Sequence, residues 1–160
     1  MEYLFNSSFG LKLGVKQVVQ EILRFMATEP KRKYKIVIGT DSERLQNKNA
    51  DFVTAIVVHR VGNGGRYFWR RLQAGKFHTL RDRIIREVML SLEAAHLFLG
   101  ELKRGVSGDN WSFEIHADIG ANGETNVLIQ EVVGMIRANN FEAKTKPESY
   151  AATKVADRHV

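Results

Sequence analysis

The order of apolar and polar residues predicts an α/β fold in which a mixed β-sheet is flanked by helices. After an N-terminal helical segment, three β-rich segments follow one another, and the later segments alternate between helix and strand. Short turns join antiparallel strands and helical connections join parallel ones, so one sheet should contain both pairings. The 160 residues are 44% hydrophobic and 26% charged, which excludes wholesale disorder, collagen and coiled coil. We expect one domain over residues 1–160, with an N-terminal helix at 12–28 and the core at 34–160.

The first half of the chain is expected to supply that helix and three strands. Residues 12–28 carry apolar side chains at helical spacing, and Pro30 follows them. The β-branched run at 34–41 is too short for a helix and predicts a buried strand. Strands at 51–61 and 66–73 flank an Asn-Gly-Gly turn, so these two should form a hairpin.

The second half is expected to alternate helix and strand. A long apolar stripe predicts a helix at 80–102, and alternation of apolar and polar residues predicts a strand at 111–119. A helix at 124–139, a short strand at 141–146 and a final helix from 150 to 160 complete the expected order. Helices then lie against a sheet in an α/β sandwich.

Composition narrows the classes of function. The chain has no cysteine, which excludes disulfides, thiolate metal sites and cysteine nucleophiles and is compatible with the cytoplasm. No apolar run approaches the ~18 residues of a membrane span, and we expect neither a signal peptide nor a membrane partner. Lys and Arg number 24 against 18 acidic residues, giving a net charge of +6. That balance favours an anionic partner, of which nucleic acid is the commonest.

Four carboxylates lie at the ends of predicted strands or on predicted helices, where they could form a site. Asp41 and Asp118 end predicted strands, Glu87 lies at the edge of an apolar helix stripe, and Asp157 lies on the last helix. Taken singly, an Asp at a strand end is most often a turn or cap residue, and Glu87 is most often a surface charge. Together, converging acids would repel one another unless a cation bound them. Oxygen ligands suit Mg²⁺ or Mn²⁺, and two such ions ~3.5–4 Å apart can drive in-line attack on a phosphodiester.

Several stretches resemble a known family. These are residues 38–42 (IGTDS), 116–120 (HADIG), 146–152 (KPESYAA) and 156–157 (AD). With the element order, they resemble the ribonuclease H-like superfamily, and more closely its YkuK-like group of bacterial proteins. The resemblance implies a five-stranded sheet in the order 3-2-1-4-5, with the first and fourth strands adjacent. It also implies that the metal ligands and catalytic residues are Asp41, Glu87, Asp118 and Asp157.

Two histidines and several cations lie near these acids in sequence. His116 and His159 are candidate proton shuttles, since histidine titrates near neutral pH. A partly buried strand histidine and a solvent-exposed terminal one are the plainer alternatives. The candidate nucleic-acid-binding residues are Arg70, Arg71, Lys76 and Arg83. The aromatic residues beside the arginines could stack bases or pack beneath the helices, and Arg83 could instead pair with Glu87 at i,i+4.

These patterns predict a metal-dependent nuclease that hydrolyses RNA, an RNA–DNA hybrid or structured DNA with two Mg²⁺ or Mn²⁺ ions. A non-catalytic nucleic-acid-binding or scaffolding module with the same fold is the alternative. The Gly-containing turn over residues 118–125 could cradle a phosphate, which leaves ATP chemistry as a weaker alternative. No nucleophile-elbow, Walker A or dinucleotide-binding motif is present. An exposed apolar face on the N-terminal helix could support a homodimer.

Overall fold

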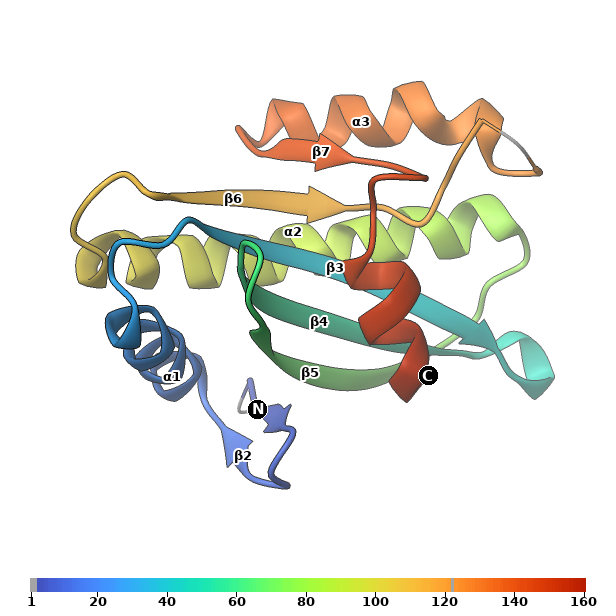
Figure 1. The fold of residues 1–160 in the computed structure, drawn as a ribbon. Coiled ribbons are helices and arrows are strands. Elements are labelled where there is room, and N and C mark those ends of the chain that lie inside the picture. The colour runs from blue at the N-terminus through green and yellow to red at the C-terminus, as the bar shows by residue number, and fades with distance from the viewer. Residues whose placement is uncertain (1–2, 122) are drawn as a thin grey trace.

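The β-rich segments form one mixed sheet in the computed structural model, which describes residues 3–121 and 123–160 (Figure 1). Its seven strands lie in the order β2-β1-β5-β4-β3-β6-β7. β6 is parallel to its neighbours β3 and β7, and the other pairings are antiparallel, which confirms the mixed α/β class. The strands are β1 Phe5–Ser7, β2 Lys12–Leu13, β3 Tyr34–Arg44, β4 Ala50–Arg60, β5 Gly65–Ala74, β6 Trp111–His116 and β7 Glu142–Lys144.

The prediction of five strands in the order 3-2-1-4-5 is wrong for the sheet as a whole. Two N-terminal strands extend it beyond β5, where Asn6 of β1 lies opposite Trp69 and Phe5 lies opposite Leu13 of β2. These strands have 3 and 2 residues, too few to show the alternation by which a strand is recognised. β1 covers an edge of β5 that would otherwise be open. The other five strands are contiguous, as β5-β4-β3-β6-β7.

Helices cover one face of the sheet, and the C-terminal segment crosses the other. The helices are α1 Val15–Thr28, α2 Leu80–Gly105 and α3 Ile129–Ala138, the last preceded by a 3₁₀ turn at Asn126–Leu128. All three pack into the main core against residues of β3, β4 and β6. The predicted final helix is instead a π-helical turn, Ala151–Ala156, followed by a 3₁₀ turn, Asp157–His159. This C-terminal segment, residues 150–160, lies over β3 and β4 (Figure 1).

Both long helices begin or end on specific polar contacts. The Thr79 side chain accepts the backbone N–H of Asp82 at the start of α2, which satisfies one of the unpaired donors there. At the end of α1, buried Arg60 donates to the Phe25 carbonyl over 2.8 Å and pairs with Glu29 at 2.6 Å. A cation at a helix C-terminus is favoured by the helix dipole, so Arg60 ties α1 to β4.

The apolar face of α1 is buried rather than exposed. Val18, Ile22 and Phe25 belong to the main core. This face is therefore occupied by the chain itself, and the expectation of a homodimer loses the support that it took from an exposed helix face. Within the described part of the chain, no helix is both long enough and apolar enough to cross a membrane.

Two strand ends differ from those predicted, and the difference shapes the site. β3 continues past Asp41 to Arg44 because it stays paired with β4, with Asp41 opposite Val53. β6 ends at His116, so Asp118 lies in the loop beyond it. The ladder between β3 and β6 stops at the pair Gly39–His116. Beyond that pair, β3 and the segment that follows β6 are no longer paired with each other. Asp41 and Asp118 lie in this region.

Candidate functional site

Asp41 and Asp118 lie together at the end of the β3–β6 ladder. Each is two residues beyond the last pair of that ladder, Gly39 and His116, on two parallel neighbouring strands. The charge of Asp118 acts on Asp41 and raises the pKa of the Asp41 carboxyl. The centre of the sheet therefore brings together two acids that are far apart in sequence.

Glu87 is brought to the same place by α2. Its side chain is buried, and Ser42 Oγ donates a 2.5 Å hydrogen bond to Glu87 Oε2. One helical turn further on, Ser91 Oγ lies 2.7 Å from Thr40 Oγ1. Residues 40 and 42 share a face of β3, and residues 87 and 91 share a face of α2. These two contacts fix the helix against the strand, and Glu87 and Asp118 line one small cavity.

Asp157 reaches the cluster from the C-terminal segment. It is exposed, lies at the start of the 3₁₀ turn and shares a hydrogen bond with Asp41. The segment packs on β3 and β4 through Val37, Val57 and Ala151, with Val53 and Ala156 beside them. The structure thus gathers all four predicted carboxylates, from β3, α2, the loop after β6 and the C-terminal segment.

This crowding changes two of the acids. The pKa of Glu87 is raised to about 8, mainly by burial and also by the charges of Asp41 and Asp118, against the opposing effects of Ser42 and Arg83. Burial also raises the pKa of Asp41 to about 7, helped by the hydrogen bond with Asp157 and by the charge of Asp118. Like charges in a partly buried place favour the protonated form. Asp41 and Glu87 therefore keep their protons to a higher pH than isolated carboxyl groups do.

The donor set fits a hard divalent cation in its chemistry. Carboxylate oxygens are the ligands that Mg²⁺ and Mn²⁺ prefer. In their present rotamers, however, the His, Asp and Glu side chains of the described residues include no group of three or more arranged to hold a metal ion. Glu87 is turned toward Ser42, and Asp118 Oδ1 lies 3.2 Å from Lys146 Nζ. An ion could be held only if such contacts gave way.

His116 is a structural link between β6 and the C-terminal segment. Its ring is buried, and its Nδ1 accepts the backbone N–H groups of Tyr150 and Ala151 at 2.9 and 3.2 Å. Its Nε2 lies 2.9 Å from a carboxylate oxygen of Glu114, so the ring hydrogen belongs on Nε2. Both nitrogens are engaged, which leaves no nitrogen available for the predicted proton shuttle.

His159 lies on the aromatic residues of β5 at the rim of the site. Its ring stacks on Trp69 with centroids 4.2 Å apart, and its Nε2 lies 3.3 Å from the Tyr67 hydroxyl. Burial, Arg158 and Arg71 lower its pKa. Phe68 points the other way into the main core. The aromatic residues of β5 are thus divided between the helix-covered face and the face under the C-terminal segment.

The four predicted nucleic-acid-binding residues do not share one surface. Arg71 stands in the same cross-strand row as Asp41, through Val53, and pairs with Asp51 at 3.4 Å. Arg70 is on the opposite face of β5, with its guanidinium 4.1 Å from the centre of the Tyr3 ring. Lys76 is exposed before α2, and Arg83 lies one turn before Glu87. Three of the four cations therefore remain candidates for a surface that serves the carboxylates.

Two residues of the site escape sequence reasoning. Ser42 holds Glu87, and Lys146 pairs with Asp118. Both lie in stretches that carry the family resemblance, but neither spacing nor composition connects them with an acid 45 or 28 residues away (87 − 42 and 146 − 118). In the predicted phosphate-cradling turn, Asn122 lies outside the described residues.

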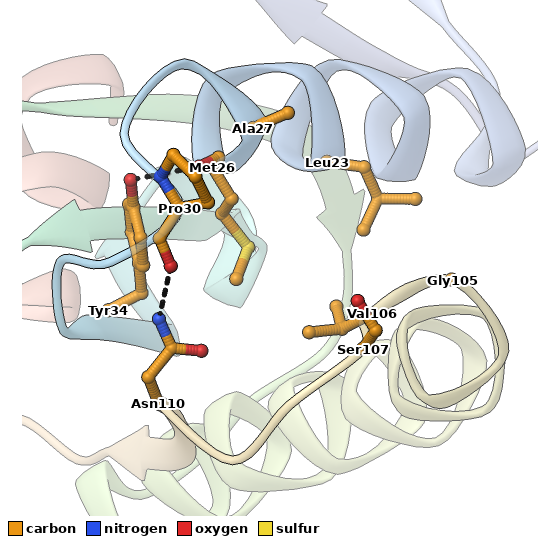
Figure 2. A pocket seen from close by; sticks show the side chains of 9 residues that line it. All are labelled: Leu23, Met26, Ala27, Pro30, Tyr34, Gly105, Val106, Ser107 and Asn110. Atoms are coloured by element: carbon orange, nitrogen blue, oxygen red, sulfur yellow. Dashed lines mark hydrogen bonds between the residues drawn. The ribbon is translucent and has the colours of Figure 1, made fainter.

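A larger hollow lies far from this cluster. It has a volume of about 310 Å³ and lies between the end of α1 and the end of α2, beside the start of β3 (Figure 2). Leu23 and Met26 form part of its apolar wall. The Tyr34 hydroxyl donates to the Glu29 carbonyl over 2.7 Å, and the Asn110 amide donates to the Pro30 carbonyl over 2.9 Å. These polar groups already bond to the protein's own backbone, so they are poorly placed to bind a ligand in the hollow.

The sheet order around β3, with a carboxylate cluster at the end of the β3–β6 ladder, is the arrangement that the ribonuclease H resemblance implies. The family model described as Ribonuclease H-like matches residues 17–160, and the chain belongs to this family. Among curated proteins, it is 34% identical over 169 residues to "Uncharacterized protein YkuK" of Bacillus subtilis (strain 168), which covers 98% of this chain and 96% of that protein. No solved structure gives a significant match. The predicted resemblance is confirmed, and it indicates a nuclease or another nucleic-acid-related function.

Proposed function

We propose that this protein is a divalent-metal-dependent nuclease that hydrolyses phosphodiester bonds in RNA, RNA–DNA hybrid or structured DNA. One observation carries the proposal. Four carboxylates from separate elements gather at the end of the β3–β6 ladder, and burial with mutual repulsion raises the pKa of Asp41 and of Glu87 into the neutral range. A cluster of this kind is costly unless a cation neutralises it.

Each acid has a role that follows from its position. Asp41 and Asp118 would be the central ligands, because Asp41 on β3 and Asp118 in the loop after β6 each lie two residues beyond the last pair of one ladder. Glu87 would add a ligand from α2, and exposed Asp157 would complete the cluster from the rim. Two bound ions would supply an activated water and stabilisation of the departing oxygen. The carboxylates would release their protons as the ions bind.

Cations near the cluster would hold the substrate backbone. Arg71 lies in the row of Asp41, and Arg83 lies one turn from Glu87. Lys76, exposed in the connection before α2, would extend the contact. Such contacts supply affinity that depends on salt and little on sequence.

A cleavage assay tests this function. Wild type is incubated with Mn²⁺ or Mg²⁺ and single-stranded RNA, RNA–DNA hybrid, duplex DNA or a branched junction. Asp41→Asn and Glu87→Gln should each lower the rate at least about 100-fold, since losing a ligand should exceed the 10–100-fold cost of losing an outer-shell partner. Exposed Asp109 and Glu93 provide matched controls, Asp109→Asn and Glu93→Gln, that should cleave normally. Equal cleavage by all five proteins would place the activity elsewhere.

A non-catalytic binding module is the second candidate. It is favoured by the present contacts of Glu87 with Ser42 and of Asp118 with Lys146, which occupy the acids without a metal ion. It predicts salt-sensitive nucleic-acid binding with no cleavage in any metal, and binding that survives Asp118→Asn.

A further inference from the structure

Lys146 is held beside Asp118 by its backbone. The loop that follows β7 runs along the loop that follows β6, and the N–H of Lys146 donates to the Ile119 carbonyl over 2.7 Å. Next to this contact, the N–H of Ala117 donates to the Lys144 carbonyl over 2.9 Å. These two backbone hydrogen bonds therefore fix the backbone of Lys146 next to Asp118.

The absence of a side chain at Gly120 leaves room for the Lys146 side chain. A Cβ atom at residue 120 would lie 2.9 Å from Lys146 Cβ and 3.5 Å from Lys146 Cδ. The methylene stem thus lies directly on the glycine, and Nζ reaches a position 3.2 Å from Asp118 Oδ1. The side chain of Asp118 is 22% exposed and that of Lys146 is 49% exposed, so the ammonium can move away into solvent.

Lys146 is the ammonium group that lies within ion-pair distance of this carboxylate cluster among the described residues. It contacts Asp118, whereas Glu87 is bonded to Ser42 and Asp41 to Asp157. The tethered charge therefore stands where a cation bound by Asp118 would stand. A divalent ion could approach Asp41 and Glu87 without moving it, but an ion that uses Asp118 Oδ1 would meet a positive charge at close range.

We propose that Lys146 controls occupancy of the second metal position, the one that uses Asp118. This inference rests on the proposed function. In the free protein, Nζ neutralises Asp118, so one ion binds firmly and the second binds weakly. A substrate phosphate would offer Nζ another partner and free Asp118 for the second ion. Lys146 then acts as a positioning residue that couples arrival of the substrate to completion of the metal site.

Titration calorimetry with MnCl₂ alone tests this inference. Lys146→Met keeps the stem on Gly120 and removes the charge, so its second Mn²⁺ should bind at least about tenfold more tightly than in wild type. Lys146→Arg keeps the charge and should behave like wild type. Lys154→Met removes an exposed lysine of the C-terminal segment and is the matched control. Circular dichroism checks that each variant folds, and Gly120→Ala, which displaces the stem, should repeat the effect of Lys146→Met.

The outcomes separate the two proposals. A tighter second ion in Lys146→Met and Gly120→Ala, with Lys146→Arg and Lys154→Met unchanged, supports the role of Lys146. Identical Mn²⁺ isotherms for wild type and Lys146→Met, both abolished by Asp41→Asn, would overturn it while leaving the proposed metal site standing. No Mn²⁺ binding by folded wild type and Lys146→Met would overturn both proposals.

Discussion

Ser42 Oγ donates a 2.5 Å hydrogen bond to Glu87 Oε2 and so joins the strand that carries Asp41 to the helix that carries Glu87. The bond lowers the pKa of Glu87 and so opposes burial, the largest cause of its rise to about 8. Ser42 therefore sets both where the carboxylate points and how readily it loses its proton. Ser42, which follows the proposed ligand Asp41 on β3, thus orients a second proposed ligand, Glu87, on α2.

Ser42→Ala should raise the pKa of Glu87 further. The variant removes the hydrogen bond that favours the charged carboxylate, and burial and the neighbouring acids remain. Carboxyl ¹³C NMR of the metal-free protein measures the titration midpoint. Ser112→Ala, at an exposed position of β6, is the control and should leave the midpoint in place. A midpoint for Glu87 that is lower in Ser42→Ala than in wild type would show that the hydroxyl does not stabilise the charge.

Stability without metal should fall as pH rises through neutrality. The pKa values of Asp41 and Glu87 are raised from 3.8 to about 7 and from 4.5 to about 8. The folded chain therefore binds these protons more tightly than the unfolded chain does. That contribution to stability is complete below about pH 4 and is lost as pH rises through these two values.

Melting temperature in EDTA across this range measures the effect. Asp41→Asn and Glu87→Gln should each flatten the decline, because each removes one of the two groups that lose a proton. Mn²⁺ should raise the melting temperature most at the alkaline end, where the acids are charged. A wild-type profile that rises steadily from acid to alkaline pH, with no change in the variants, would contradict the assigned pKa directions.

His116→Ala should destabilise the protein strongly. It leaves the N–H groups of Tyr150 and Ala151 without their acceptor and leaves the buried Glu114 carboxylate without its donor. Breaking a buried polar network of this kind costs about 3 kcal/mol or more. Urea denaturation measures the loss, and His78→Ala, at an exposed position, should cost far less. Equal stability of the two variants would remove His116 as the anchor of the C-terminal segment.

Arg71→Met and Arg70→Met should separate the two faces of β5. Arg71 shares the row of Asp41, whereas Arg70 lies over Tyr3 on the opposite face. In an Asp41→Asn background that cannot cleave, Arg71→Met should weaken hybrid binding and lower the salt slope by about 1. Arg70→Met should change neither quantity. Fluorescence anisotropy at several salt concentrations decides the matter, and the reverse pattern would place the substrate on the helix-covered face.

The long elements of the fold could be predicted from sequence because their patterns are strong. The run at 34–41 that begins β3 is almost entirely buried, and the apolar stripe of α2 is buried except at Leu80 and Leu99, which are half-buried. β1 and β2 could not be predicted, because 2 or 3 residues carry no period. The ends of β3 and β6 were misplaced for another reason. They depend on which neighbour each strand pairs with, and that information is not local.

Part of the site, too, could be predicted from sequence and part could not. Asp41, Glu87, Asp118 and Asp157 were predicted from their places at element ends and from the resemblance, and the fold gathers them. Ser42 and Lys146 were missed, since their importance comes from contacts between segments that only the folded chain brings together. His116 is the opposite case. Its residue type suggested a proton shuttle, but both of its ring nitrogens make structural hydrogen bonds.

The central claim is that these carboxylates form one divalent-cation site. Diffraction from crystals grown with Mn²⁺, with data collected for the anomalous signal of manganese, tests it most directly. We predict an anomalous peak bounded by the carboxylates of Asp41 and Glu87, with Glu87 turned away from Ser42. No peak at the cluster at saturating Mn²⁺, with the contacts Ser42–Glu87 and Lys146–Asp118 intact, would contradict the claim.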